Sequence, residues 1–92
     1  MKTIIVTGGS GFIGSNFILK NIKKYKIINI DKLTYASNIN YLKDISEYKN
    51  YFFYKVDINE TKKINLIIRK YKPIFLFNFA AESHVDKSII NS

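Results

Sequence analysis

Cysteine and tryptophan are absent from the 92-residue sequence, proline occurs once, and Arg69 is the sole arginine. The lack of cysteine excludes disulfide scaffolds, thiol chemistry, zinc ribbons and iron–sulfur clusters. Long hydrophobic runs are also missing. The first apolar run, residues 4–6, is too short for the core of a signal peptide or for a membrane span. We therefore expect a cytoplasmic protein with no membrane partner.

Negative charge is scarce as well. Seven acidic residues stand against 15 basic ones, which gives a net charge of +8 with His84 neutral. The positive charge is nearly all lysine, scattered in ones and twos, whereas base readout and bidentate phosphate contacts favour arginine. Because Lys, Ile, Asn, Tyr and Phe have A/T-rich codons, genome composition is a sufficient cause of this balance. We expect no nucleic-acid partner; a basic nucleic-acid-binding module is an alternative that rests on charge alone.

Short runs of β-branched and aromatic residues alternate with longer amphipathic stretches. Asn59 is a candidate N-cap for the last of these stretches, and Pro73 ends it. The apolar patterns predict strands over residues 2–7, 26–31, 51–56 and 74–79, and helices over residues 12–24, 40–45 and 60–71.

Strands that alternate with helices predict an α/β fold, here a Rossmann-type parallel sheet with flanking helices and right-handed crossovers. The strands are continuously apolar, which suits a sheet that is buried on both faces. A doubly wound sheet normally continues beyond its fourth strand. We therefore expect residues 1–92 to be the N-terminal part of a larger dinucleotide-binding domain, with the substrate domain outside them.

The glycines lie together in residues 8–14 (GGSGFIG), between the first expected strand and the first expected helix. The segment fits G-x-G-x-x-G from Gly9. In such a loop one glycine makes the tight turn, another lets N–H groups approach a pyrophosphate, and the last, here Gly14, permits close packing of the helix. The helix N-terminus attracts phosphates. An ordinary turn is the alternative, but the strand before and the helix after favour dinucleotide binding.

Asp31 closes the second expected strand, where a carboxylate can accept hydrogen bonds from an adenosine ribose. A carboxylate there also repels a 2′-phosphate, so the pattern predicts NAD and not NADP as the cofactor. A simple turn residue is the alternative, and the adjacent Lys32 could partner a phosphate. Asp57, after the third strand, has two interpretations of equal weight: contact with the adenine, or capping of the following helix.

Three segments carry a resemblance to a known family. Residues 7–16 (TGGSGFIGSN) resemble the opening of the extended short-chain dehydrogenase/reductase superfamily. Residues 31–38 (DKLTYASN) and 78–89 (NFAAESHVDKSI) are more specific and resemble the dTDP-glucose 4,6-dehydratase family. Ser37 and Lys87 stand where many members have glycine and arginine, and neither change removes a needed group.

The resemblance implies an NAD-dependent lyase of the rhamnose pathway that acts on a dTDP-sugar and forms a homodimer. It also implies that Ser83 touches both the cofactor and the sugar nucleotide. Taken with the glycine loop, it gives these cofactor-binding residues: Gly8, Gly11, Phe12, Ile13, Gly14, Asp31, Lys32, Leu33, Thr34, Asp57, Ile58, Phe79, Ala80, Ala81 and Ser83.

No residue of this chain is expected to be catalytic. Tyr51 and Lys55 have the Tyr-x-x-x-Lys spacing of the superfamily's catalytic pair, but they lie on an expected strand. Four residues span roughly 13 Å on a strand and only ~5–6 Å on a helix. The resemblance places the family's acid–base triplet and Tyr–Lys pair beyond residue 92.

Glu82, His84 and Asp86 lack a fourth ligand, so we expect no metal site. Two further interpretations stay open. One is the NAD-binding part of another nucleotide-sugar epimerase or decarboxylase, which would share the glycine loop. The other is a non-catalytic dinucleotide-binding fragment.

Overall fold

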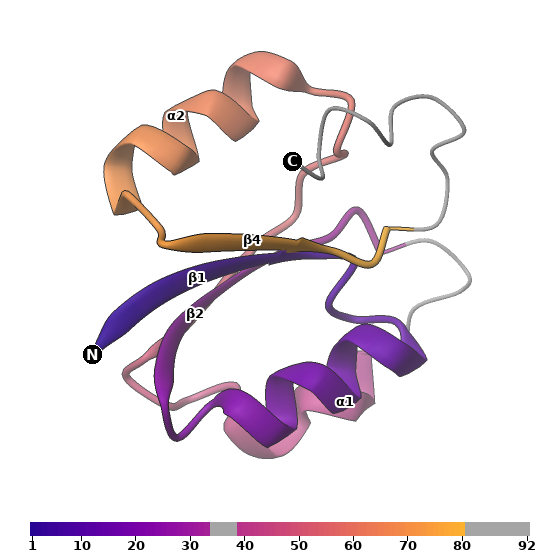
Figure 1. Ribbon diagram of the computed structural model, residues 1–92. Helices are drawn as coiled ribbons and strands as arrows, with labels where there is room; N and C mark the ends of the chain where they lie inside the picture. The colour runs from indigo at the N-terminus through magenta and orange to yellow at the C-terminus, as the bar shows by residue number, and fades with distance from the viewer. Residues whose placement is uncertain (34–38, 81–92) are drawn as a thin grey trace.

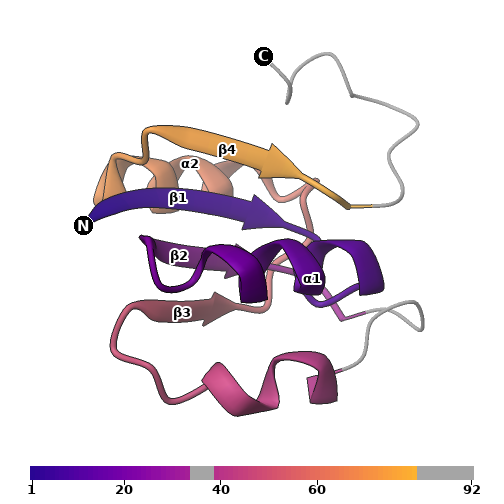
Figure 2. The ribbon, with the colours of Figure 1, turned by 60° about the horizontal axis from the view of Figure 1, so that its bottom comes forward.

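The computed structural model describes residues 1–33 and 39–80. They form a single sheet with the strand order β3-β2-β1-β4, and all three pairings are parallel. Figure 2 shows the strands side by side, with every carboxyl end at the same edge. This arrangement confirms the predicted Rossmann-type fold. The strands are β1 (Lys2–Thr7), β2 (Tyr25–Ile30), β3 (Tyr51–Tyr54) and β4 (Phe75–Asn78).

The helices cover both faces of the sheet (Figure 1). Helix α1 (Phe12–Asn21) and the 3-10 helix η1 (Ile39–Ile45) lie on one face, and α2 (Thr61–Tyr71) lies on the other. None of them is long and apolar enough to cross a membrane, within the part of the chain that the structure describes.

The sheet has an apolar core on each face, one beneath α1 and η1 (the α1-side core) and one beneath α2 (the α2-side core). The interior strands β1 and β2 contribute to both because successive side chains point to opposite faces. In β1, Ile4 and Val6 pack under α1, whereas Ile5 packs under α2. In β2, Ile27 faces α1 and Ile28 faces α2, and all five side chains are at most 1% exposed. Burial of one such side chain stabilises the fold by ~1.5–3 kcal/mol. These two strands therefore anchor both layers.

Helix α1 ends three residues before its predicted end at Lys24, because a distant residue caps it. The Asn50 side-chain amide donates to the Ile22 carbonyl at 2.6 Å and to the Tyr25 carbonyl at 3.0 Å. Those contacts hold the turn between α1 and β2. The chain enters β2 one residue earlier than predicted and leaves it at Ile30.

The prediction that Asn59 is the N-cap of α2 is wrong. The helix begins at Thr61, and Glu60 occupies the cap position without a side-chain cap hydrogen bond. At the other end Lys72 adopts a left-handed conformation, and its N–H donates to the Ile68 carbonyl at 2.8 Å. Strands β3 and β4 are shorter than predicted, and the short helix near residues 40–45 is present as η1.

We predict that Asn50→Ala lowers the free energy of unfolding by about 1–3 kcal/mol, since two part-buried carbonyls lose their donor. Urea unfolding followed by circular dichroism measures the change. Asn59→Ala is the matched control: Asn59 is exposed and does not cap the helix, so its removal should cost less than about 0.5 kcal/mol. Equal losses in the two variants would contradict the capping role of Asn50.

The Tyr54 and Tyr71 hydroxyls lie 2.6 Å apart in the α2-side core. Burial, followed by the hydrogen bond with Tyr54, raises the pKa of Tyr71 to about 12. The unfolded phenol ionises near pH 10. The stability that this pair contributes is therefore complete below about pH 10 and is lost as the pH rises toward 12.

We predict that Tyr71→Phe makes the loss of unfolding free energy above about pH 10 shallower than in the unmodified chain. Urea midpoints measured at a series of alkaline pH values test this. Tyr48→Phe, which removes a phenol that is 43% exposed, serves as the control and should keep the original slope. An unchanged slope in Tyr71→Phe would show that this phenol does not couple to folding.

Candidate functional site

The glycine loop follows β1 at the carboxyl edge of the sheet, and β4 leaves the sheet directly over it. Gly8 has φ +74°, a conformation that side chains other than glycine rarely adopt. A Cβ on Gly8 would also lie 2.5 Å from the Ala80 backbone nitrogen. The turn therefore needs glycine for its backbone angle and for the close approach of the backbone that follows β4. In the order β3-β2-β1-β4, β2 and β3 follow on one side of β1 and β4 on the other, and such folds bind ligands at this switch in strand order.

The start of α1 is packed tightly against this loop. A Cβ on Gly14 would overlap the Gly8 carbonyl oxygen. The first backbone hydrogen bond into the helix runs from the Ser15 N–H to the Gly11 carbonyl at 2.9 Å. The N–H groups of the preceding residues belong to the first turn, where no intrahelical acceptor exists. Phe12 and Ile13 are 65% and 67% exposed, so an apolar surface borders these N–H groups.

Asp31 lies immediately after β2 and is 9% exposed. One carboxylate oxygen accepts a hydrogen bond from the Ser10 N–H of the glycine loop at 2.8 Å. The other accepts from the Leu33 N–H, also at 2.8 Å. Leu33 has φ +60°, a left-handed angle that costs a leucine ~1–3 kcal/mol and persists only where the surrounding contacts enforce it. Asp31 thus shapes both the glycine loop and the segment that follows β2.

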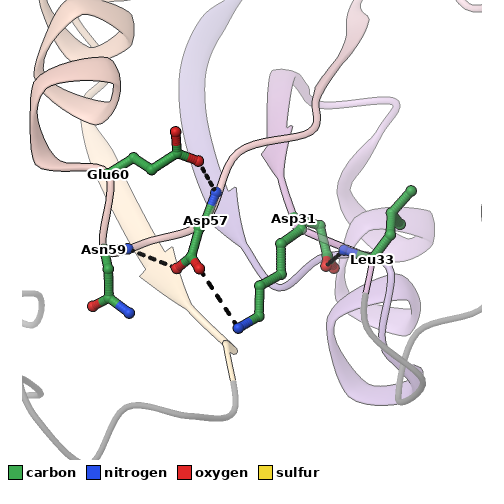
Figure 3. A network of polar contacts seen from close by, with 6 residues as sticks. Asp31, Leu33, Asp57, Asn59 and Glu60 are labelled. Carbon is green, nitrogen blue, oxygen red and sulfur yellow. Dashed lines mark hydrogen bonds and ion pairs between the residues drawn. The ribbon is translucent and has the colours of Figure 1, made fainter.

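Asp57 lies after β3 and is the centre of a local polar network (Figure 3). Its carboxylate accepts from the Asn59 N–H at 2.9 Å, and its own N–H donates to the Glu60 carboxylate at 2.9 Å. This backbone hydrogen bond, assisted by Lys63, lowers the pKa of Glu60. The reciprocal contacts resemble a capping box, in which two side chains satisfy two backbone donors. They close a turn just before α2 and do not cap the helix itself, whose cap position is Glu60, and contact of Asp57 with a cofactor stays a prediction.

Lys32 joins the carboxyl ends of β2 and β3, with its ammonium 3.6 Å from the Asp57 carboxylate. Both side chains are more than a third exposed, so the ion pair adds little stability. It does bring two predicted cofactor-binding residues together at the edge of the sheet where Asp31 lies.

The structure places most of the predicted cofactor-binding residues at one edge of the sheet, after β1, β2, β3 and β4. Ile58 packs against the α2-side core. Phe79 packs against the α1-side core, with its ring 5.3 Å from that of Phe17. Thr34, Ala81 and Ser83 lie outside the described residues, as do Glu82, His84 and Asp86.

Tyr51 and Lys55 do not form a helical pair, because Tyr51 begins β3 and the strand ends just before Lys55. Tyr51 turns its hydroxyl toward Asn29 on β2, whose amide donates to it at 3.0 Å. Burial raises the pKa of the Tyr51 phenol, the Asp31 carboxylate adds to the rise, and the bond from Asn29 opposes it. The phenol is therefore a partly buried group that Asn29 holds against the sheet.

Sequence reasoning missed two polar groups behind the site. Asn29 is fully buried within β2 and contacts the glycine loop. At the end of β1, the Thr7 hydroxyl donates to Asn78 at 2.5 Å, and Asn78 also accepts from the Ala80 N–H at 3.1 Å. In each case the sequence did hold a signal, which is an asparagine in an otherwise apolar strand: Asn29 in β2 and Asn78 at the end of β4.

A metal centre has no support in residues 1–33 and 39–80, where no group of three or more His, Cys, Asp or Glu could hold an ion. A pocket of about 530 Å³ opens beside the glycine loop, between η1 and β3. Ser10, Leu33, Tyr51 and Phe53 are among the residues that line it. Its walls are mostly apolar.

Comparison with known proteins gives a consistent result. A curated dTDP-glucose 4,6-dehydratase from Haemophilus influenzae is 48% identical over 92 residues, which is 97% of this chain and 27% of that protein. The crystal structure of dTDP-glucose 4,6-dehydratase from Bacillus anthracis in complex with NAD is 42% identical, with a TM-score of 0.81 over 89% of this chain and 27% of that one.

The dTDP-glucose 4,6-dehydratase DesIV from Streptomyces venezuelae, solved with NAD bound, is 33% identical, with a TM-score of 0.79 over 97% of this chain and 29% of that one. This chain therefore spans less than a third of the length of the proteins it matches. The family model described as GDP-mannose 4,6 dehydratase matches residues 5–92. With the glycine loop, the parallel sheet and the acidic residue after β2 all in place, the chain belongs to the GDP-mannose 4,6 dehydratase family.

Proposed function

We propose that this chain forms the NAD-binding part of a dTDP-glucose 4,6-dehydratase. The observation that carries the proposal is the hydrogen bond from the Ser10 N–H to Asp31. It joins the glycine loop after β1 to the carboxylate after β2. A pyrophosphate and an adenosine ribose are recognised by these two features, and a dinucleotide requires them to be adjacent.

The residues present fit such a cofactor. Each Asp31 oxygen accepts one hydrogen bond from the described backbone, and a carboxylate oxygen has two lone pairs. One lone pair on each oxygen is thus left for the ribose hydroxyls. The first turn of α1 offers N–H groups and a partial positive charge to the pyrophosphate. When bound, NAD would supply a hydride acceptor, while this chain's residues bind and orient it.

The groups that act on the sugar are proposed to lie outside residues 1–92. Within the described part of the chain, the carboxylates and hydroxyls near the glycine loop are engaged in structural hydrogen bonds. The relatives' name supports a dTDP-sugar as the substrate. A cytoplasmic location and a homodimeric enzyme are further parts of the proposal. A nucleotide-sugar epimerase or decarboxylase would use the same kind of cofactor-binding part, so the product of the reaction distinguishes these enzymes from a dehydratase.

For cofactor choice, we predict that the chain binds NAD more tightly than NADP, and that Asp31→Ser lowers the ratio of the two affinities by about tenfold, or ~1.4 kcal/mol. The physical reason is that the carboxylate repels the 2′-phosphate. Isothermal titration with both cofactors gives the ratio. The variant also loses loop contacts, but that damage affects both cofactors and cancels in the ratio.

Asp44→Asn is the control, because it removes one negative charge from the exposed surface of η1 and should leave the ratio unchanged. Equal affinities of the unmodified chain for NAD and NADP would contradict the assignment of Asp31. So would an equal change of the ratio in both variants.

For catalysis, we predict that the 92-residue chain alone converts no dTDP-glucose, whereas a chimera in which it replaces the matching segment of the Haemophilus influenzae relative forms the 4-keto-6-deoxy sugar. The missing acid–base groups each contribute ~10²–10⁴-fold to the rate. The product is followed by its ultraviolet absorbance in alkali.

The same chimera carrying Gly14→Val is the negative control, since a side chain there overlaps the Gly8 carbonyl. Turnover by the 92-residue chain itself would show that its residues include the catalytic groups. A folded but inactive chimera, or one that yields a 4-epimer, would contradict the proposed function.

A further inference from the structure

Asn29 is a polar residue in the middle of a buried strand, and its side chain is 0% exposed. It faces the α1 side of the sheet, like Ile27 two residues before it, which belongs to the apolar core. A buried amide costs free energy unless its donors and acceptor are paired. The hydrogen bonds of Asn29 should therefore explain why an asparagine occupies this position.

The Asn29 amide makes three hydrogen bonds, and two of them reach the glycine loop. Its Oδ1 accepts from the Gly9 N–H at 3.0 Å, and its Nδ2 donates to the Ser10 hydroxyl at 3.2 Å. The second Nδ2 hydrogen goes to the Tyr51 hydroxyl of β3 at 3.0 Å. Because a backbone N–H can only donate, the oxygen must face Gly9, so the orientation of the amide is fixed.

Gly9 also packs so closely against Asn29 that there is no room for a side chain at position 9. A Cβ on Gly9 would overlap the Asn29 Oδ1 and would lie 2.5 Å from the Ile18 Cδ1. The loop thus rests directly on the Asn29 side chain. The next N–H, that of Ser10, goes to Asp31. Two successive N–H groups of the loop are therefore tied to Asn29 and Asp31, two alternate positions of the same chain segment.

We propose that Asn29 is a positioning residue for the pyrophosphate of the cofactor, an inference that rests on the proposed NAD-binding function. Asn29 holds Gly9 and Ser10 in place before the cofactor arrives, so the first-turn N–H groups of α1 are already aimed. A loop that is ordered in advance loses less conformational entropy on binding, which raises affinity. The amide is neutral, so it adds no negative charge beside the phosphates.

Asn29→Leu tests the proposal, because leucine has a similar size and suits an apolar strand but cannot bind the loop. The probes are NAD, ADP and adenosine, measured by isothermal titration, with folding checked by circular dichroism. We expect the affinities for NAD and ADP to fall about tenfold and that for adenosine to change less than about twofold. A purely structural role would weaken all three equally. Asn65→Leu on the exposed side of α2 is the matched control and should change none of them.

Amide hydrogen exchange of the unmodified chain keeps the proposal testable if Asn29→Leu does not fold. The Gly9 and Ser10 amides should already exchange slowly without NAD and change little when NAD is added. Rapid exchange that slows only with NAD would overturn the proposal, as would unchanged NAD binding by folded Asn29→Leu. If the unmodified chain binds neither NAD nor ADP, the proposed function itself fails and the role of Asn29 fails with it.

Discussion

Burial of β1 and β2 on both faces is the constraint on which the rest of the structure depends. The last four residues of each strand, 4–7 and 27–30, are buried, so every polar group there needs a partner inside the protein. The Thr7 hydroxyl donates a hydrogen bond to Asn78. The Asn29 amide hydrogen-bonds with the glycine loop and with Tyr51, and the Asp31 carboxylate accepts from two backbone N–H groups. The polar architecture of the site follows from this lack of solvent.

The same constraint explains what could be predicted from the sequence. A strand buried on both faces is continuously apolar, and a run that stops at a glycine cluster marks its end. Residues 2–7 accordingly match β1 at both ends, and the amphipathic repeat of residues 60–71 locates α2 to within one residue. These patterns report only on neighbours along the chain. They predict the parallel order of the elements and bring Gly8–Gly14 and Asp31 to one edge.

Contacts between distant positions were not predictable in this way. Asn50 caps the end of α1 from 28 residues away, and nothing in the local sequence around Asn21 indicates that partner. The Asn29 side-chain oxygen accepts its hydrogen bond from Gly9, which lies 20 residues earlier in the chain. The box formed by Asp57 and Glu60 is different, because its D-x-x-E spacing is local. Asp57 was a candidate cap on sequence grounds, but its pairing with Glu60 was not predicted, and the two residues close a turn just before α2.

The two hydrogen bonds that Asp31 accepts limit how this position can change. Its carboxylate holds the Ser10 N–H of the glycine loop and the strained Leu33 at the same time. A lineage that replaces Asp31 to accept a different nucleotide would also lose the acceptors for both N–H groups. In the role proposed for Asp31, cofactor preference is coupled to local folding, and a change of preference needs a compensating acceptor elsewhere. Substitution of this carboxylate would thus cost local stability whichever nucleotide the chain binds.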